Sequence, residues 1–208
     1  MSGTWPWLML AGLGAFHGLN PAMGWLFAVA LGLHRGSRRV VWLSLLPISI
    51  GHALSIAAVA LVFVLAGALI DGPVVRLVAG IALIAWAVYH WRFGSRHRVR
   101  VGLQTGLIGL GLWSFLMATA HGAGLMLWPA LMPLCFPAGS TTAASDALWW
   151  AALGVGLHTM AIVAVAGTIA IAVYEWIGVE VLKRAWINLD LIWVLALVGA
   201  GAWLLVLP

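Results

Sequence analysis

Four of the seven histidines lie inside long apolar stretches of the chain, at His17, His52, His121 and His158. An ionisable side chain at bilayer depth is costly and usually marks a binding site or an ion pathway. Neutral imidazole, the form that an apolar environment favours, ligates transition metals, so the four rings predict a site for Zn, Ni, Co, Cu or Fe. Two axial pairs could instead hold haem, which we favour less. Any one ring alone is also explained as an interhelical hydrogen-bond donor.

Four other residues are weaker candidates for a role in the binding site. Asn20 follows His17 by three residues and shares its helical face, so it could be a ligand, a supporting partner or a helix cap. Met117 and Met160 each lie within four residues of a histidine. Their thioethers would favour copper(I), although filling a core is the more ordinary role of methionine. Asp190 lies just inside the last apolar stretch, where it could pair with a cation or be solvated.

The composition identifies the class of protein. The chain is 64% hydrophobic and 7% charged, whereas a soluble domain is about 25% charged. It is therefore expected to be an all-α integral membrane protein, a single membrane domain over residues 1–208 with room for about six spans of ~20 residues. Cys135 is the single cysteine, which excludes an internal disulfide and a cysteine-based zinc motif.

Six apolar segments are predicted to cross the membrane, over residues 5–33, 40–70, 74–91, 101–136, 147–174 and 185–207. The first is expected to break near residues 17–21, because Pro21 removes a helix hydrogen bond. The fourth is too long for one straight span and is expected to be broken within residues 121–137. We expect a full span to about Pro129, then a bent, re-entrant or interfacial segment, with Pro133 and Pro137 beyond it.

Basic residues predict the topology. Nine of the ten Lys and Arg residues fall in the first, third and fifth connections: Arg35, Arg38, Arg39, Arg92, Arg96, Arg98, Arg100, Lys183 and Arg184. Cytoplasmic loops are enriched in Lys and Arg, so these connections are expected in the cytoplasm, with both termini outside a bacterial-type inner membrane. Because these cations lie in short loops, they indicate topology and not a nucleic-acid partner. The expected partners are the lipid bilayer and a small solute or metal ion, and a homo-oligomer is left open.

The two halves of the chain show signs of duplication. His52 and His158 lie 106 residues apart, and five of the nine positions that begin at each histidine are identical. His17 and His121 pair at an offset of 104. Two repeats of three spans, residues 1–100 and 101–208, must be inserted in opposite orientations because three is odd. This inverted-repeat plan is found in many secondary transporters, with the site near the midplane at broken helices.

The order of these features resembles the LysE superfamily of small exporters. A first span broken at Asn20-Pro21 is followed by a basic turn, then by Asp71-Gly72-Pro73 and an arginine-rich loop. The resemblance implies six spans in a 3+3 arrangement and export of amino acids, transition metals or other small solutes. His121-Gly122 stands where amino-acid exporters of the superfamily tend to carry a second Asn-Pro.

The sequence thus predicts a secondary transporter that exports a divalent transition metal through a midplane site of His17, His52, His121 and His158. Proton exchange at the same histidines could drive it. If the protein is a transporter, the alternative substrate is an amino acid or another small organic solute. An intramembrane histidine-ligated metalloenzyme or haem protein, and an accessory subunit without a site, are the alternatives of other classes.

Overall fold

The structure, a computed structural model, describes residues 3–70, 72–93, 106–137, 142–177 and 189–206. Its elements within these ranges are all helices, which confirms the predicted all-α class. In order they are α1 (Trp5–Leu19), the 3₁₀ turn η1 (Pro21–Met23), α2 (Trp25–His34), α3 (Arg38–Leu69), α4 (Gly72–Phe93), α5 (Leu107–Ala120), α6 (Ala123–Cys135), α7 (Ala144–Ala172), the π turn η3 (Val173–Ile177) and α8 (Leu189–Val206).

Several of these helices are long and apolar enough to cross a membrane. In the described ranges three qualify alone, Arg38–Gly67, Gly72–Phe93 and Ala144–Trp176. The pair α5 and α6 adds a fourth if its two bent segments count as one span. Helix α2 and most of α8 are apolar but shorter. The membrane character expected from composition is therefore supported, and the number of six spans stays a prediction.

The first helix breaks where the sequence predicted. Helix α1 ends at Leu19, Asn20 is extended, and the chain makes one 3₁₀ turn before α2. Gly24 precedes α2 with φ of 113°, a left-handed conformation that side chains disfavour. The indole of Trp25 donates to the Leu19 carbonyl oxygen at 3.3 Å, which satisfies a backbone acceptor that the end of α1 leaves open.

The second break lies within the expected residues 121–137, but at their beginning. The bend expected after Pro129 is wrong, because Pro129 and Pro133 both lie inside α6. The chain instead bends by 69° between α5 and α6, at His121-Gly122. Gly122 has φ of 70°, and this left-handed residue turns the chain. At membrane depth a helix tolerates proline when packed neighbours surround it, and Pro129 is buried in the core.

The direction of each helix follows from its contacts. Helix α1 runs parallel to α7, since Gly14 lies against His158 and Gly18 against Ile162. Helix α5 runs parallel to α3, since the Ser114 hydroxyl donates to the Ile48 carbonyl oxygen at 2.7 Å and the hydroxyls of Ser55 and Thr119 are 2.8 Å apart.

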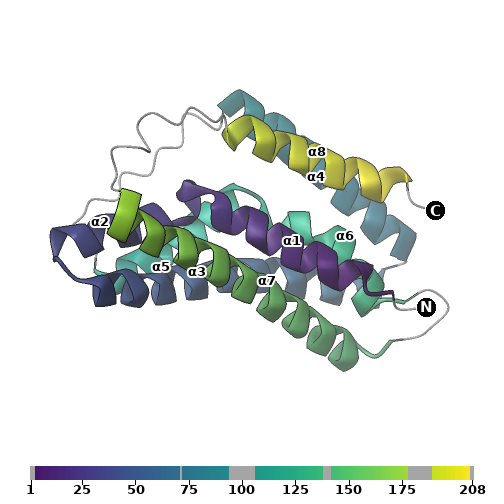
Figure 1. The fold of residues 1–208 in the computed structure, drawn as a ribbon. Coiled ribbons are helices and arrows are strands. Elements are labelled where there is room, and N and C mark those ends of the chain that lie inside the picture. The colour runs from purple at the N-terminus through teal and green to yellow at the C-terminus, as the bar shows by residue number, and fades with distance from the viewer. Residues whose placement is uncertain (1–2, 71, 94–105, 138–141, 178–188, 207–208) are drawn as a thin grey trace.

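The two long helices α3 and α7 run in opposite directions. Their register is marked by Arg38 at the start of α3, which pairs with Glu175 beyond the end of α7 at 2.9 Å. Helices α4 and α8 lie side by side as a separate pair (Figure 1) and are also antiparallel, because Gly80 packs against Leu205 while Ile84, further along α4, packs against Gly201, which is earlier in α8. The core thus brings together helices from both halves of the chain.

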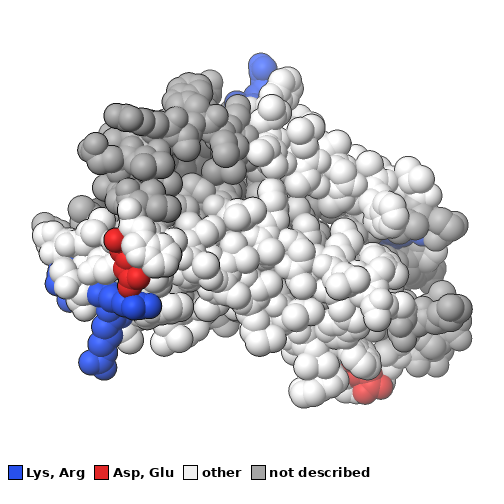
Figure 2. All heavy atoms as spheres, viewed as in Figure 1, with Lys and Arg blue, Asp and Glu red and all other residues white. Residues whose placement is uncertain are grey.

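The outer surface is mostly apolar, as a lipid-facing surface must be. Large hydrophobic side chains are exposed along every long helix, for example Leu8, Leu54, Ile108 and Leu195. Figure 2 shows one face on which the charged side chains lie at the margins and the middle carries none. Part of the predicted basic loops, including Arg96, Arg98, Arg100, Lys183 and Arg184, lies outside the described residues.

Candidate metal centre

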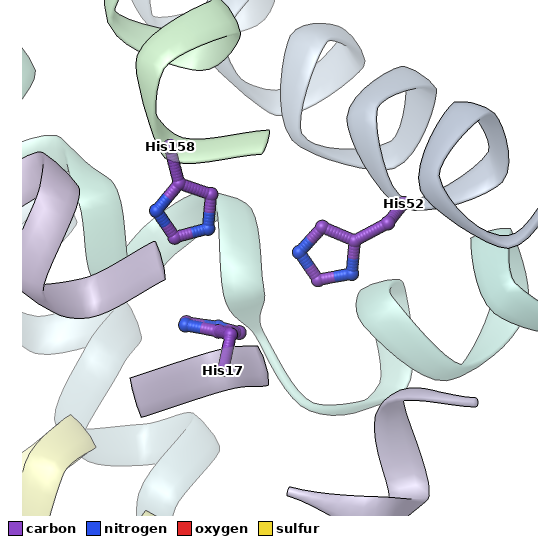
Figure 3. Close-up of side chains that lie close together, drawn as sticks. All are labelled: His17, His52 and His158. Atoms are coloured by element: carbon purple, nitrogen blue, oxygen red, sulfur yellow. The ribbon is translucent and has the colours of Figure 1, made fainter. Parts of the chain in front are cut away.

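Three of the four predicted histidines meet inside the helix bundle. His17 of α1, His52 of α3 and His158 of α7 are at most 2% exposed, and their rings converge on one point (Figure 3). The ring centroids are 5.4 Å apart for His17 and His52, 4.9 Å for His17 and His158, and 5.9 Å for His52 and His158. One nitrogen from each ring lies within 4.8 Å of the other two. We call these residues the histidine triad.

Close packing of α1 on α7 sets the spacing of the triad. A Cβ atom at Gly14 would overlap the His158 carbonyl oxygen, and one at Gly18 would lie 2.9 Å from the Ile162 carbonyl oxygen. Only glycine lets the two helix backbones approach this closely. His17 and His158 therefore lie nearer to each other than either lies to His52.

Backbone carbonyls fix the tautomer of two triad rings. The Nδ1 atom of His17 is 2.7 Å from the Leu13 carbonyl oxygen, and Nδ1 of His158 is 3.1 Å from the Leu10 carbonyl oxygen. A carbonyl oxygen can only accept, so both Nδ1 atoms carry the proton. In a neutral ring the lone pair then resides on Nε2. Metal-ligating histidines are oriented in this way, with the second ring nitrogen bonded to a carbonyl or carboxylate.

The Nε2 atoms of all three triad rings are buried and have no hydrogen-bond partner in the structure. A buried polar atom without a partner costs on the order of 1–3 kcal/mol. Because the three rings lie together, a single ligand that accepts several lone pairs would satisfy them. A transition-metal ion has that property, and imidazole is among its common protein ligands.

The spacing of the rings would let them hold a metal ion after a small rotation of the side chains. Imidazoles on one tetrahedral ion, with metal–nitrogen bonds of about 2.0–2.1 Å, have ring centroids about 5 Å and ligand nitrogens about 3.4 Å apart. The triad centroids bracket the first value. For the second, the widest pair at 4.8 Å would close by about 1.4 Å, which side-chain rotation can supply. Three rings leave a fourth coordination position open.

No buried acidic side chain is described that could balance the charge of an ion bound by the triad. Among the described residues the buried polar side chains are histidine, asparagine and serine, and none is acidic. A bound divalent ion would keep its charge in an apolar bundle, so its binding is weaker than in a site with carboxylate ligands.

A small cavity adjoins the triad at His52. It is about 10 Å³, room for about one water-sized occupant. Its lining also includes Met23 and Trp25 at the first helix break, together with Ser49 and Ile162. The cavity therefore adjoins both His52 and the α1–α2 break.

The fourth predicted histidine lies apart from the triad. His121 is 5% exposed at the α5–α6 break, and its ring faces His90 of α4 with centroids 5.2 Å apart. The indole of Trp193 lies between the two groups, 4.5 Å from the His17 ring and 5.6 Å from the His121 ring. Sequence reasoning missed His90, because it precedes Arg92 at the end of a span and resembles an interfacial residue.

The weaker candidates are scattered. Asn20 is buried at the end of α1, within the first helix break. Met117 is half-buried, and its carbonyl oxygen accepts from Nδ1 of His121. Met160 is 64% exposed and so points away from the buried triad. Asp190 lies in the first turn of α8, but its side chain is not among those described.

Comparison with known proteins gives no match for this chain. Neither a protein-family model, nor a curated protein, nor a solved structure matches the chain.

Proposed function

We propose that this protein is a secondary transporter that carries a divalent transition-metal ion through the histidine triad. The observation that carries the proposal is the histidine triad itself, three buried rings that each have one nitrogen within 4.8 Å of the other two and a buried Nε2 atom with no hydrogen-bond partner in the structure. Zn, Ni, Co, Cu and Fe all accept imidazole ligands, and the open fourth position leaves room for water or another exchanging ligand.

The arrangement of helices supports transport over a purely structural role. Helices α1 and α5 run parallel to α7 and α3 respectively, and α3 and α7 are antiparallel. Helices α1 and α5 therefore point in opposite directions, as do α4 and α8. These directions are what two inverted repeats of three spans, residues 1–100 and 101–208, would produce.

Local features repeat in the same pattern. Each half has a broken helix, and a glycine in the left-handed region precedes the second segment, Gly24 in one and Gly122 in the other. His17 and His121 each donate from Nδ1 to the carbonyl oxygen four residues earlier. These features support the 3+3 arrangement that the LysE resemblance implies, with a binding site at broken helices.

The charges support the predicted topology. Arg35, Arg38 and Arg39 follow α2, and Glu175, which pairs with Arg38, follows α7 at the same end of the bundle. We propose that this end faces the cytoplasm of a bacterial-type inner membrane.

The neutral ligand set suits an ion that must be released. An intramembrane metalloenzyme would share the three-ligand open site, so ion flux is what distinguishes transport from catalysis. The buried side chains described near the triad include no carboxylate that would hold the charge of the ion. A site that binds an ion without charge compensation releases it readily, which is what passage requires.

Metal binding by purified protein tests the proposal. Titration of Co²⁺ into the detergent-solubilised chain should give the visible spectrum of a histidine-ligated ion. We expect His158→Gln to weaken binding by more than the roughly 10–100-fold cost of losing an orienting partner. His34→Gln, at an exposed position at the end of α2, is the matched control and should bind normally.

Transport is then measured in liposomes that contain a metal-sensitive dye. Wild type and His34→Gln should carry the ion, and His158→Gln should not. Tight retention of one ion without flux would favour the metalloenzyme. Normal binding by His158→Gln would disprove the triad, and binding of an amino acid without any metal would favour the organic-solute exporter.

A further inference from the structure

A second pair of imidazoles lies on the other side of Trp193 from the triad. His90 is half-buried on α4, His121 is buried at the α5–α6 break, and their ring centroids are 5.2 Å apart. We call these two residues the histidine pair. They come from different halves of the chain, as the members of the triad do.

Hydrogen bonds orient the His121 ring as they orient His17. Its Nδ1 atom is 2.8 Å from the Met117 carbonyl oxygen, so Nδ1 carries the proton and Nε2 the lone pair in the neutral ring. The Nε2 atom of His90 is buried as well. Imidazole is a common ligand of transition metals, and the two rings lie beside each other.

Helix α4 is held against the α5–α6 break beside the pair. The indole of Trp86, one turn before His90, donates to the Ala120 carbonyl oxygen at 3.1 Å. The Trp193 indole donates to the His121 carbonyl oxygen at 2.6 Å. The two indoles satisfy the acceptors that the break leaves open, and they fix α4 and α8 relative to His121.

The spacing of the pair fits one ion. Two imidazoles on a tetrahedral ion have ring centroids about 5 Å apart, close to the separation observed here. Two protein ligands leave two coordination positions for water, which suits a site that an ion occupies briefly during transport. The residues that follow His90, Trp91 and Arg92, are exposed, so the pair lies between the buried triad and the polar end of α4.

We propose that the histidine pair is a second transition-metal site, through which an ion passes between the end of α4 and the triad. The role of the histidine pair in moving an ion to the triad rests on the proposed function. Its capacity to bind a metal ion does not depend on metal binding by the triad. Trp193, with its ring against both His17 and His121, separates the two sites.

The number of Co²⁺ ions bound per chain tests the proposal. His90→Gln and His121→Gln are the pair variants, His52→Gln is the triad variant, and His34→Gln is the surface control. Wild type and His34→Gln should bind two ions. Each pair variant should keep one ion with the spectrum and affinity of the triad, and His52→Gln should keep the other ion. Size-exclusion profiles and tryptophan fluorescence confirm that each variant is folded.

The outcomes separate the two proposals. Undiminished stoichiometry in folded His90→Gln and His121→Gln would overturn the pair. Undiminished stoichiometry in His52→Gln, with one ion lost in His90→Gln, would overturn the triad and keep the pair. In liposomes, His90→Gln should slow metal flux at least about tenfold while triad affinity is unchanged, and a flux equal to that of His34→Gln would disprove its role in transfer.

Discussion

The Nδ1–H of His158 donates to the Leu10 carbonyl oxygen at 3.1 Å, between residues 148 positions apart in the chain. This bond joins α7 to α1 and directs the Nε2 atom of His158 toward the other rings of the triad. Two triad rings, His17 and His158, thus take their orientation from carbonyls of the same helix, one turn apart. Any change that separates α1 from α7 should disturb the metal site.

Gly14→Ala tests that coupling. The new methyl would lie 2.8 Å from the Ala161 Cβ and overlap the His158 carbonyl oxygen. We expect α1 and α7 to separate, with a loss of stability of about 1–3 kcal/mol and weaker Co²⁺ binding. Gly12→Ala, on the same helix with nothing within 4 Å of the new methyl, is the control and should lose neither. Equal Co²⁺ affinity in the two variants would contradict the coupling.

Metal binding should weaken as the pH falls. Each triad nitrogen must be unprotonated to ligate, so protons compete with the ion, and up to three of them compete at once. Co²⁺ affinity, measured from about pH 8 down to the lowest pH at which the protein stays folded, should therefore fall at the acid end of that range, where the buried rings accept protons. The binding that remains in His52→Gln, at the histidine pair, should show a shallower slope, because at most two protons compete with the ion there. An affinity that does not change with pH would contradict histidine ligation.

Metal removal should lower thermal stability. An ion that binds only the folded chain stabilises it by about 2.7 kcal/mol at a concentration 100 times its Kd. The unfolding temperature of wild type in detergent should rise with added Zn²⁺ and return to its first value with a chelator. The shift should be much smaller in His17→Gln, where the triad has lost one ligand. A similar shift in both would show that Zn²⁺ acts elsewhere.

Gly122→Ala should destabilise the second helix break. The residue has φ of 70°, where a Cβ atom costs about 1–2 kcal/mol, and the methyl would lie 2.8 Å from Cδ1 of Trp86. The movement of Trp86 should change the near-ultraviolet circular dichroism spectrum and lower the unfolding temperature. Gly106→Ala, with φ of −67° and open space around it, should leave both unchanged.

Trp193→Phe should loosen the contact between α8 and the α5–α6 break. It removes the donor to the His121 carbonyl oxygen, and a buried acceptor left unpaired costs about 1–3 kcal/mol. Trp203→Phe, at a 49% exposed position of the same helix, is the control. Amide exchange should rise around residues 119–124 in the first variant alone. Unchanged exchange there would show that the bond does not hold the break.

Local chemistry made part of this structure predictable. The break after Asn20 follows from the missing N–H of Pro21, which acts wherever the chain lies. The spacing of the histidines predicted that four rings would meet, and the structure brings three of them together, His17, His52 and His158. The same argument included His121, which lies against His90 instead.

The spacing of the histidines along the sequence does not predict where His121 lies, because its position depends on how the helices pack. A left-handed Gly122 turned the chain eight residues or so before the expected bend at Pro129, and it directed His121 toward α4. Pro129 stays helical because α6 is surrounded by buried neighbours. His90 could have been found by asking which histidines lie one turn from a tryptophan near a broken helix, since Trp86 supplies the contact that holds it there.

The size of the cavity beside His52 limits what the proposed transporter could carry past that residue. At about 10 Å³ it admits about one water-sized particle, so an ion that entered it would have lost most of its hydration shell. The ions that pass would be those that exchange water for imidazole quickly, one ligand at a time. Mg²⁺ sheds its waters reluctantly and prefers oxygen, so it should be rejected by slow dehydration as well as by weak affinity.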